Sequence, residues 1–138
     1  DDPDDVLESI RFLVTKGGVD VVFLDHITML VTGNENDDER RKLDYISTKM
    51  KKMAKELRFC LVIISHVNDD GKTRGSRNIT KVANTVIHMS RDLTSTDELT
   101  RNTLVLTIEK ARLTGRTGPG GRYFFDTSSY TLKELPDV

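Results

Sequence analysis

Two apolar runs in the sequence each end in residues whose side chains can do chemistry. Residues 21–24 lead into Asp25, and residues 60–64 lead into Ser65 and His66. Several apolar side chains in a row predict a strand buried on both faces, as in parallel sheets. Open α/β sheets bind ligands at the carboxyl ends of such strands. A carboxylate there suits a magnesium ion beside a nucleotide phosphate. The alternative is a strand that simply exits into a polar turn.

The segment between these two runs has helical periodicity. We expect a helix from about Asp37 to Arg58 with an apolar stripe and, on its other faces, lysines that we interpret as solvated. Two buried strands joined through a helix make a βαβ unit. Asp25 and His66 should therefore face the same edge of one sheet. The stripe consists of Leu43, Ile46, Met50, Met53 and Leu57.

The remaining segments extend this α/β pattern. A first helix begins at Asp2-Pro3, an N-cap followed by proline, and stops at Gly17-Gly18. Because the sequence opens directly on a capped helix, we interpret it as a piece of something longer. Further along, the pattern predicts a polar loop at 66–78, a helical turn at 79–83, strands at 85–89 and 103–110, a polar connection at 91–101, a glycine-rich turn at 113–121 and a hairpin with arms 122–126 and 130–132.

Composition excludes several classes of protein. The chain has 138 residues, enough for one compact domain, and a net charge of −1, so any nucleic-acid contact must use a local patch. One cysteine makes no internal disulfide, and Cys60 is expected to be an inert core thiol of a reducing compartment. Three histidines and one cysteine at unrelated spacings do not suit a structural zinc site. No run is apolar enough for a membrane span, so we expect a cytoplasmic protein.

Four strings, in this order, resemble the ATPase domain of hexameric replicative helicases. The likeness is greatest to bacteriophage primase–helicases and less to DnaB-like helicases and their mitochondrial relative. No single string is diagnostic, but the ordered set spans most of the chain. The strings are VVFLDHITMLV at 21–31, LVIISHVN at 61–68, TRGSRNITKVANTVIHMSRD at 73–92 and IEKARLTGRTG at 108–118.

The resemblance implies roles for the residues at the two strand ends. Asp25 matches the acidic residue that ends the Walker B strand and holds Mg²⁺. His66 matches the polar residue that senses the γ-phosphate of ATP or another NTP, although a histidine can also merely close a strand. His26 follows the Walker B carboxylate in related phage enzymes too, where it orients the loop at most.

The resemblance also places single-stranded DNA on the loop after His66. Asn68, Lys72, Arg74 and Arg77 are its candidate donors to phosphates. The sequence departs from its phage relatives in this loop. The loop is shorter, it carries Asp69-Asp70, and Arg77 stands where relatives have a small residue.

Lys110 and Arg112 match a pair that the family supplies to the nucleotide of the neighbouring subunit. Arg112 would be the arginine finger and Lys110 its partner, meeting negative charge on the transferring phosphoryl group. This role implies a homo-oligomer, a hexameric ring. The alternative is a basic strand end that is merely solvated.

The phosphate loop itself is missing, because no GxxxxGK[ST] motif occurs in the sequence. By the resemblance, that loop and the catalytic glutamate lie upstream, and the phosphate-loop strand sits between the strands at 60–65 and 85–89. We therefore predict an α/β, RecA-like P-loop NTPase core with a mostly parallel sheet, flanking helices and a C-terminal hairpin, lacking that strand. Residues 1–138 would be the C-terminal part of a helicase motor domain, inactive alone, in a parent to which a primase is fused or bound.

Two other readings remain open at the level of sequence. One is a RecA-type recombinase or related ATPase, which shares the core strands and the magnesium carboxylate. The other is a RecA-like module without activity, used for assembly. The K-x-R-x-x-G string at 110–115 favours the helicase over the recombinase.

Overall fold

The computed structural model describes residues 2–30, 37–67 and 77–136, with only the backbone described at 37–39. Two compact units divide the chain, one formed by Asp1–Ala83 and the other by Asn84–Val138. Each unit has its own sheet. In the described residues no helix is both long enough and apolar enough to cross a membrane.

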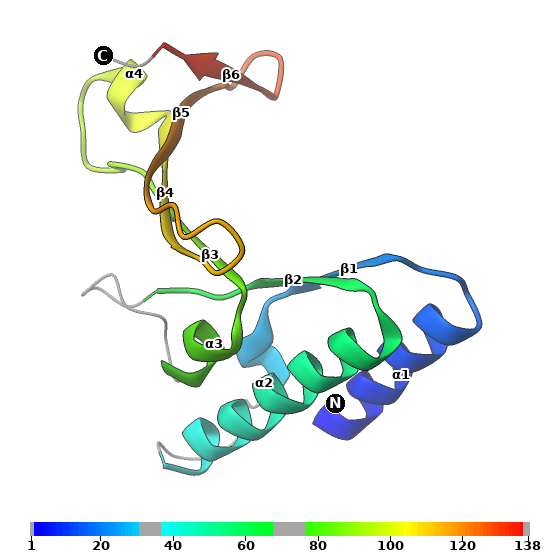
Figure 1. Ribbon diagram of the computed structural model, residues 1–138. Coiled ribbons are helices and arrows are strands. Elements are labelled where there is room, and N and C mark those ends of the chain that lie inside the picture. The colour runs from blue at the N-terminus through cyan, green and yellow to red at the C-terminus, as the bar shows by residue number, and fades with distance from the viewer. Residues whose placement is uncertain (1, 31–36, 68–76, 137–138) are drawn as a thin grey trace. The chain divides into compact units, whose positions relative to one another are not determined.

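The first unit is built from helices packed on a pair of strands (Figure 1). The N-cap prediction is confirmed, since the Asp2 side chain accepts a hydrogen bond from the Asp4 backbone N–H at 3.0 Å. The predicted long helix is also confirmed. In chain order the elements are α1 (Pro3–Thr15), β1 (Val21–Asp25), the 3₁₀ helix η1 (Ile27–Leu30), α2 (Asp37–Leu57), β2 (Cys60–Ile64) and α3 (Arg77–Val82).

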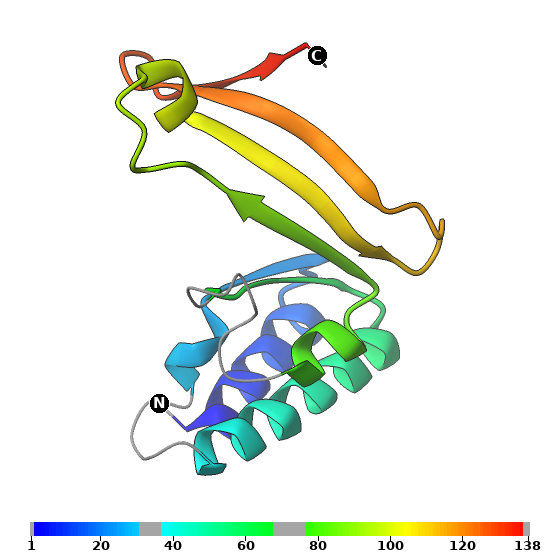
Figure 2. The same ribbon diagram turned by 90° about the vertical axis from the view of Figure 1, so that its left-hand side faces the viewer.

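The core of the first unit lies between the helices and one face of the strand pair. The predicted stripe of α2 supplies its centre, with Leu43, Ile46 and Met50 fully buried. Figures 1 and 2 show α1 and α2 on the same side of β1 and β2. Amphipathic helices bury their apolar stripe in this way, and that burial provides most of their stability. The other buried apolar residues of this core are Leu7, Ile10, Ile27, Met53, Phe59 and Ile79.

β1 and β2 pair in parallel, as predicted for a βαβ unit, from Val21 opposite Cys60 to Asp25 opposite Ile64. The prediction that these strands are buried on both faces is wrong. Val22 and Leu24 pack on the core, whereas the Phe23 side chain is 71% exposed. Successive side chains point to opposite faces of a strand, and the helices of this unit cover only one of them. An apolar run therefore specified the strand correctly but not its second covering layer.

Cys60 illustrates the same error. It was expected to be a core thiol, but it is exposed. Cys60 pairs with Val21, and paired residues of a parallel ladder lie on the same face, which is the uncovered one. Its position at the start of β2 adds to this exposure.

The second unit is a four-stranded antiparallel sheet in the order β3-β4-β5-β6. Its strands are β3 (Thr85–Ser90), β4 (Thr103–Ala111), β5 (Gly118–Asp126) and β6 (Thr131–Leu135). The expectation of a mostly parallel sheet holds for β1 and β2 alone. The links from β4 to β5 and from β5 to β6 are too short for the crossover helix that a parallel pair needs. The connection after β3 holds only the short helix α4 (Glu98–Arg101), where the sequence predicted a polar connection without a helix.

The predicted glycine-rich turn at 113–121 is only half correct. Its first part connects the strands, but residues 118–121 belong to β5 and pair with β4 across a register shift. A Cβ added at Gly120 would lie 3.1 Å from the Ile108 Cδ1 atom. Gly120 therefore reflects close packing against Ile108 within a bulged strand as well as the need for a turn.

The predicted C-terminal hairpin is confirmed as β5 and β6. Its turn is organised by Asp126, which accepts hydrogen bonds from the Ser128 backbone N–H at 2.9 Å and the Ser128 hydroxyl at 2.6 Å. The Lys133 ammonium lies 2.7 Å from the same carboxylate. Hydrogen bonds from Lys133 and then Ser128 hold the pKa of Asp126 far below its usual range.

Candidate functional site

The end of β1 and the end of β2 bring three of the singled-out side chains together. Asp25 is the last residue of β1, opposite Ile64 in the parallel ladder, so His66 follows two residues beyond the same edge. The rings of His26 and His66 meet edge to face with their centroids 4.4 Å apart. The His26 Nδ1 atom lies 3.8 Å from the Asp25 Oδ1 atom. The predicted meeting of Asp25 and His66 at one sheet edge is therefore confirmed.

The backbone on the β1 side of this edge is firmly held. η1 begins directly after His26, whose carbonyl accepts a hydrogen bond from the Met29 backbone N–H at 3.1 Å. Ile27 is fully buried in the core and Thr28 is nearly so. The chain thus turns at His26 with a core residue as its anchor, and Asp25 projects where β1 stops.

Exposure differs among the three side chains in a way that matters for chemistry. The Asp25 side chain is 71% exposed, whereas that of His26 is 29% exposed. His66 is exposed as well. An accessible carboxylate and an accessible imidazole can meet a ligand in solution, whereas His26 is half-buried.

The donor set at this edge fits a magnesium ion. Mg²⁺ prefers oxygen ligands, keeps several waters, and is commonly held by one or two carboxylates together with phosphate oxygens. Asp25 offers one exposed carboxylate of this kind. Among the described residues no cluster of three or more His, Cys, Asp or Glu is arranged to hold a metal by itself. The arrangement therefore suits a metal that arrives with its nucleotide rather than one caged by side chains.

The predicted DNA loop is described only at its downstream end. Asn68, Lys72 and Arg74 lie outside the described residues. Arg77 is the first residue of α3, and its side chain is exposed.

A hydrogen-bond network joins α3 to α2 directly beside Arg77. The Asn78 side-chain amide donates to the Asp44 backbone oxygen, the Ser47 hydroxyl and the Thr48 hydroxyl, each at 3.0 Å. Ser47 is only 2% exposed. Buried polar atoms that share partners in this way fix the relative position of two elements. The start of α3 is thereby tied to the central helix of its unit.

Lys110 and Arg112 belong to the second unit, at the far end of β4. Lys110 is half-buried and pairs with Val86 of β3. The Arg112 backbone N–H donates to the Asn84 oxygen at 2.8 Å, which continues the ladder one residue beyond β4, and its side chain is exposed. Lys110 therefore lies within β4, and Arg112 is the first residue of the turn that follows it.

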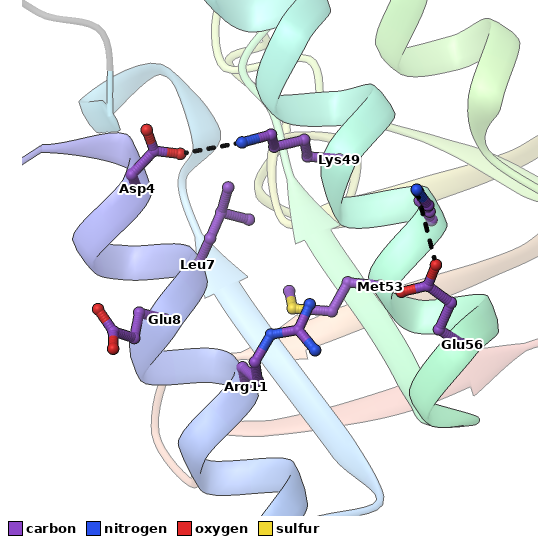
Figure 3. Close-up of a pocket in the computed structure, with 8 residues that line it drawn as sticks. Asp4, Leu7, Glu8, Arg11, Lys49, Met53 and Glu56 are labelled. Atoms are coloured by element: carbon purple, nitrogen blue, oxygen red, sulfur yellow. Dashed lines mark hydrogen bonds and ion pairs between the residues drawn. The ribbon is translucent and has the colours of Figure 1, made fainter.

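Two lysines of α2 have charged neighbours at the protein surface. In the groove between α1 and α2, Lys49 lies 3.4 Å from Asp4 and Lys52 lies 3.8 Å from Glu56 (Figure 3). The Lys49 ammonium also sits 4.4 Å from the centre of the Tyr45 ring. Hydrogen bonding to Tyr45, and then the charge of Asp4, raise the pKa of Lys49. Lys49 and Lys52 are thus paired at the protein surface, in keeping with the predicted solvated face.

Sequence reasoning missed two features of this region. It gave His26 no partner. His26 directly follows β1 and His66 lies just after β2, so the parallel pairing of these strands should have suggested that the two histidines are in contact. It also passed over Asn78, because an asparagine near the start of a helix is ordinarily interpreted as a cap. No pattern in the sequence indicates the partners of Asn78, which lie 30 to 34 positions upstream.

Comparison with known proteins agrees with these observations. Residues 2–128 match the family model for the DnaB-like helicase C terminal domain. A DNA helicase/primase of Enterobacteria phage T3 is 30% identical over 149 aligned residues. That alignment covers 93% of this chain and 26% of the phage protein, so the chain spans about a quarter of its relative's length.

Proposed function

We propose that this chain, which belongs to the family of DnaB-like helicase C-terminal domains, supplies half of the motor site of a replicative DNA helicase driven by NTP hydrolysis. The observation that carries the proposal is the junction of Asp25 and His66 at one edge of the β1–β2 pair. This edge is where parallel strands of open α/β sheets bind ligands. The similarity to a phage helicase/primase supports the same role.

Asp25 and His66 divide the work at this edge. Asp25 holds the ion directly or through water and so positions it against the nucleotide. The Mg²⁺, when bound with the nucleotide, neutralises charge on the β- and γ-phosphates. His66 offers a ring N–H to the γ-phosphate, so its hydrogen bond exists with a triphosphate and is lost with a diphosphate. ATP or another NTP would bind here.

Lys110 and Arg112 serve the nucleotide of a neighbouring copy. A fixed guanidinium stabilises negative charge that develops on the transferring phosphoryl group. Because the finger acts in trans, hydrolysis would require assembly, which we propose is a hexameric ring.

Single-stranded DNA would be contacted by the segment between His66 and α3. Asn68, Lys72 and Arg74 of that segment and Arg77, the first residue of α3, are the proposed phosphate contacts, and the Asn78 network ties the start of α3 to α2. We also propose that a primase is fused to or associated with the parent protein. The proposed site of action is the cytoplasm of a bacterial or phage-infected cell.

The decisive experiment changes Asp25 and His66 in the intact gene product. We expect Asp25→Asn and His66→Ala each to lower the DNA-stimulated rate of NTP hydrolysis by about 100-fold or more, since each removes a charge-stabilising group. Affinity for single-stranded DNA should stay within about twofold in the absence of nucleotide. Glu8→Gln, an exposed carboxylate on α1, is the matched control for Asp25. Full hydrolysis by the Asp25→Asn protein would refute the assignment of this edge as the nucleotide site.

A further inference from the structure

The structure gives His26 a partner that the proposed roles of Asp25 and His66 leave unexplained. Its ring is packed edge to face on the ring of His66, at 4.4 Å between centroids. Its Nδ1 atom is 3.8 Å from the Asp25 Oδ1 atom. One side chain therefore touches both proposed functional groups, one on each strand end.

The two histidines differ in how firmly they are held. His26 is bracketed by β1 and η1, and the next residue, Ile27, is fully buried. Its carbonyl is also engaged by the Met29 N–H. His66 lies two residues past the end of β2, and its side chain is exposed. An exposed histidine samples several rotamers unless a neighbour selects one, and here the neighbour is the better-anchored ring of His26.

We propose that His26 is a positioning residue that holds the His66 imidazole in the orientation needed to recognise the γ-phosphate. The proposal rests on the sensor role proposed for His66 and adds the device that orients it. A hydrogen-bond donor that is already oriented when the ligand arrives loses less conformational entropy on binding. More of the free energy of the hydrogen bond then contributes to affinity. His26 does not itself touch the nucleotide in this account.

The proximity of His26 to Asp25 gives the arrangement a second consequence. Because His26 follows Asp25 in the chain and its ring contacts that of His66, it links the proposed ion-binding group to the proposed sensor across the two paired strands. The ion-binding group and the phosphate-sensing group then meet a single triphosphate at a set separation. A loss of His26 should consequently affect triphosphate recognition more than binding of a diphosphate.

The test is the ratio of affinities for a non-hydrolysable NTP analogue and the matching NDP. It is measured by fluorescence titration of the intact gene product with Mg²⁺ present. We expect His26→Ala to lower the preference for the triphosphate by roughly three- to tenfold, the worth of an edge-to-face ring pair. NDP affinity should remain unchanged. His26→Phe keeps a ring for the contact and should retain the preference within about twofold of the unmodified protein.

Three further variants make the outcome decisive. Met29→Ala alters an exposed side chain of η1, keeps the backbone N–H that the His26 carbonyl accepts, and should leave the ratio unchanged. The double variant His26→Ala/His66→Ala should match His66→Ala alone, because His26 acts only through His66. An unchanged ratio in His26→Ala, alongside a lowered ratio in His66→Ala, would overturn the positioning role and spare the sensor role. An unchanged ratio in His66→Ala would overturn both.

Discussion

Individual residues at the ends of β1 and β2 form the nucleotide site that we propose. The accessible groups are an acid and an imidazole, and the less accessible His26 lies against both. Such a division separates groups that meet the ligand from groups that orient them. The same separation applies to the proposed DNA segment, where Arg77 is exposed and Asn78 is engaged with α2.

Arg112 provides a prediction about catalysis in trans. Arg112→Ala in the intact gene product should lower DNA-stimulated hydrolysis by about 1000-fold, since an arginine finger contributes on this order. Nucleotide affinity should change by less than about threefold, because the finger acts on the developing charge. Steady-state kinetics and equilibrium titration measure the two quantities. Arg116→Ala, an exposed arginine of the same β4–β5 connection, is the control.

A mixing experiment separates action in trans from action in cis. Subunits carrying Arg112→Ala are combined with subunits carrying Asp25→Asn. Rings assembled from both should regain part of their hydrolysis, because some interfaces then join an intact Asp25 to an intact Arg112. Mixtures as inactive as their components would count against the finger.

The proposed DNA contacts provide a prediction about salt dependence. Lys72→Ala combined with Arg74→Ala should weaken single-strand binding and reduce the slope of log K against log salt by about 1.4, since each lost phosphate contact contributes about 0.7. Binding isotherms at several salt concentrations measure the slope. Lys55→Ala, an exposed cation of α2, should leave it unchanged. A slope that persists in the double variant would move the DNA site elsewhere.

At the scale of elements, the structure shows how short connections decide sheet type. β1 and β2 are joined through the long helix α2 and are parallel, whereas β4, β5 and β6 follow one another through short links and are antiparallel. Each element is held in place by contacts that sequence spacing does not reveal. Two of these contacts, at α3 and at the β5–β6 turn, can be tested.

The attachment of α3 to α2 depends on Asn78. Asn78→Ala removes the donor to three acceptors, one of them on the nearly buried Ser47. The free energy of local opening of α3 should fall by about 1–3 kcal/mol, the cost of leaving buried partners unsatisfied. Hydrogen exchange of amides 77–83, followed by mass spectrometry, measures it. Arg77→Ala changes an exposed neighbour and should shift the free energy of local opening by less than about 0.5 kcal/mol. Unaltered exchange in Asn78→Ala would show that α3 is held by apolar packing alone.

The β5–β6 turn should show a defined pH dependence. The pKa of Asp126 is lowered, chiefly by Lys133 and then Ser128, so its stabilising contribution is complete above the unfolded pKa of about 3.9 and is lost as the pH falls below it. Asp126→Asn should therefore speed hydrogen exchange of residues 122–135 at pH 7, and this difference should shrink below about pH 4. A difference that is constant with pH, after correction for intrinsic rates, would assign the effect to geometry rather than charge.

At the scale of the whole molecule, the sequence predicted elements well and their surroundings less well. Periodicity located α2, and the two apolar runs located β1 and β2, with Asp25 and His66 at the same edge of the pair. The same run predicted two covered faces for β1, which Phe23 contradicts, because a sequence records apolarity and not which neighbour is present. Partners far apart along the chain, such as Asn78 and Ser47, leave no periodic pattern to detect.

The absence of a phosphate-loop motif from these 138 residues leads to the last prediction. The ends of β1 and β2 supply the proposed acid and the proposed sensor, but binding of the β- and γ-phosphates in P-loop NTPases depends on backbone N–H groups and a lysine of that motif. The isolated 138-residue chain, shown to be folded by circular dichroism, should therefore hydrolyse no NTP above background in a phosphate-release assay, with or without single-stranded DNA. The intact gene product should hydrolyse NTP under the same conditions. Robust turnover by the isolated chain would mean that a complete site exists within it and would refute the half-site account.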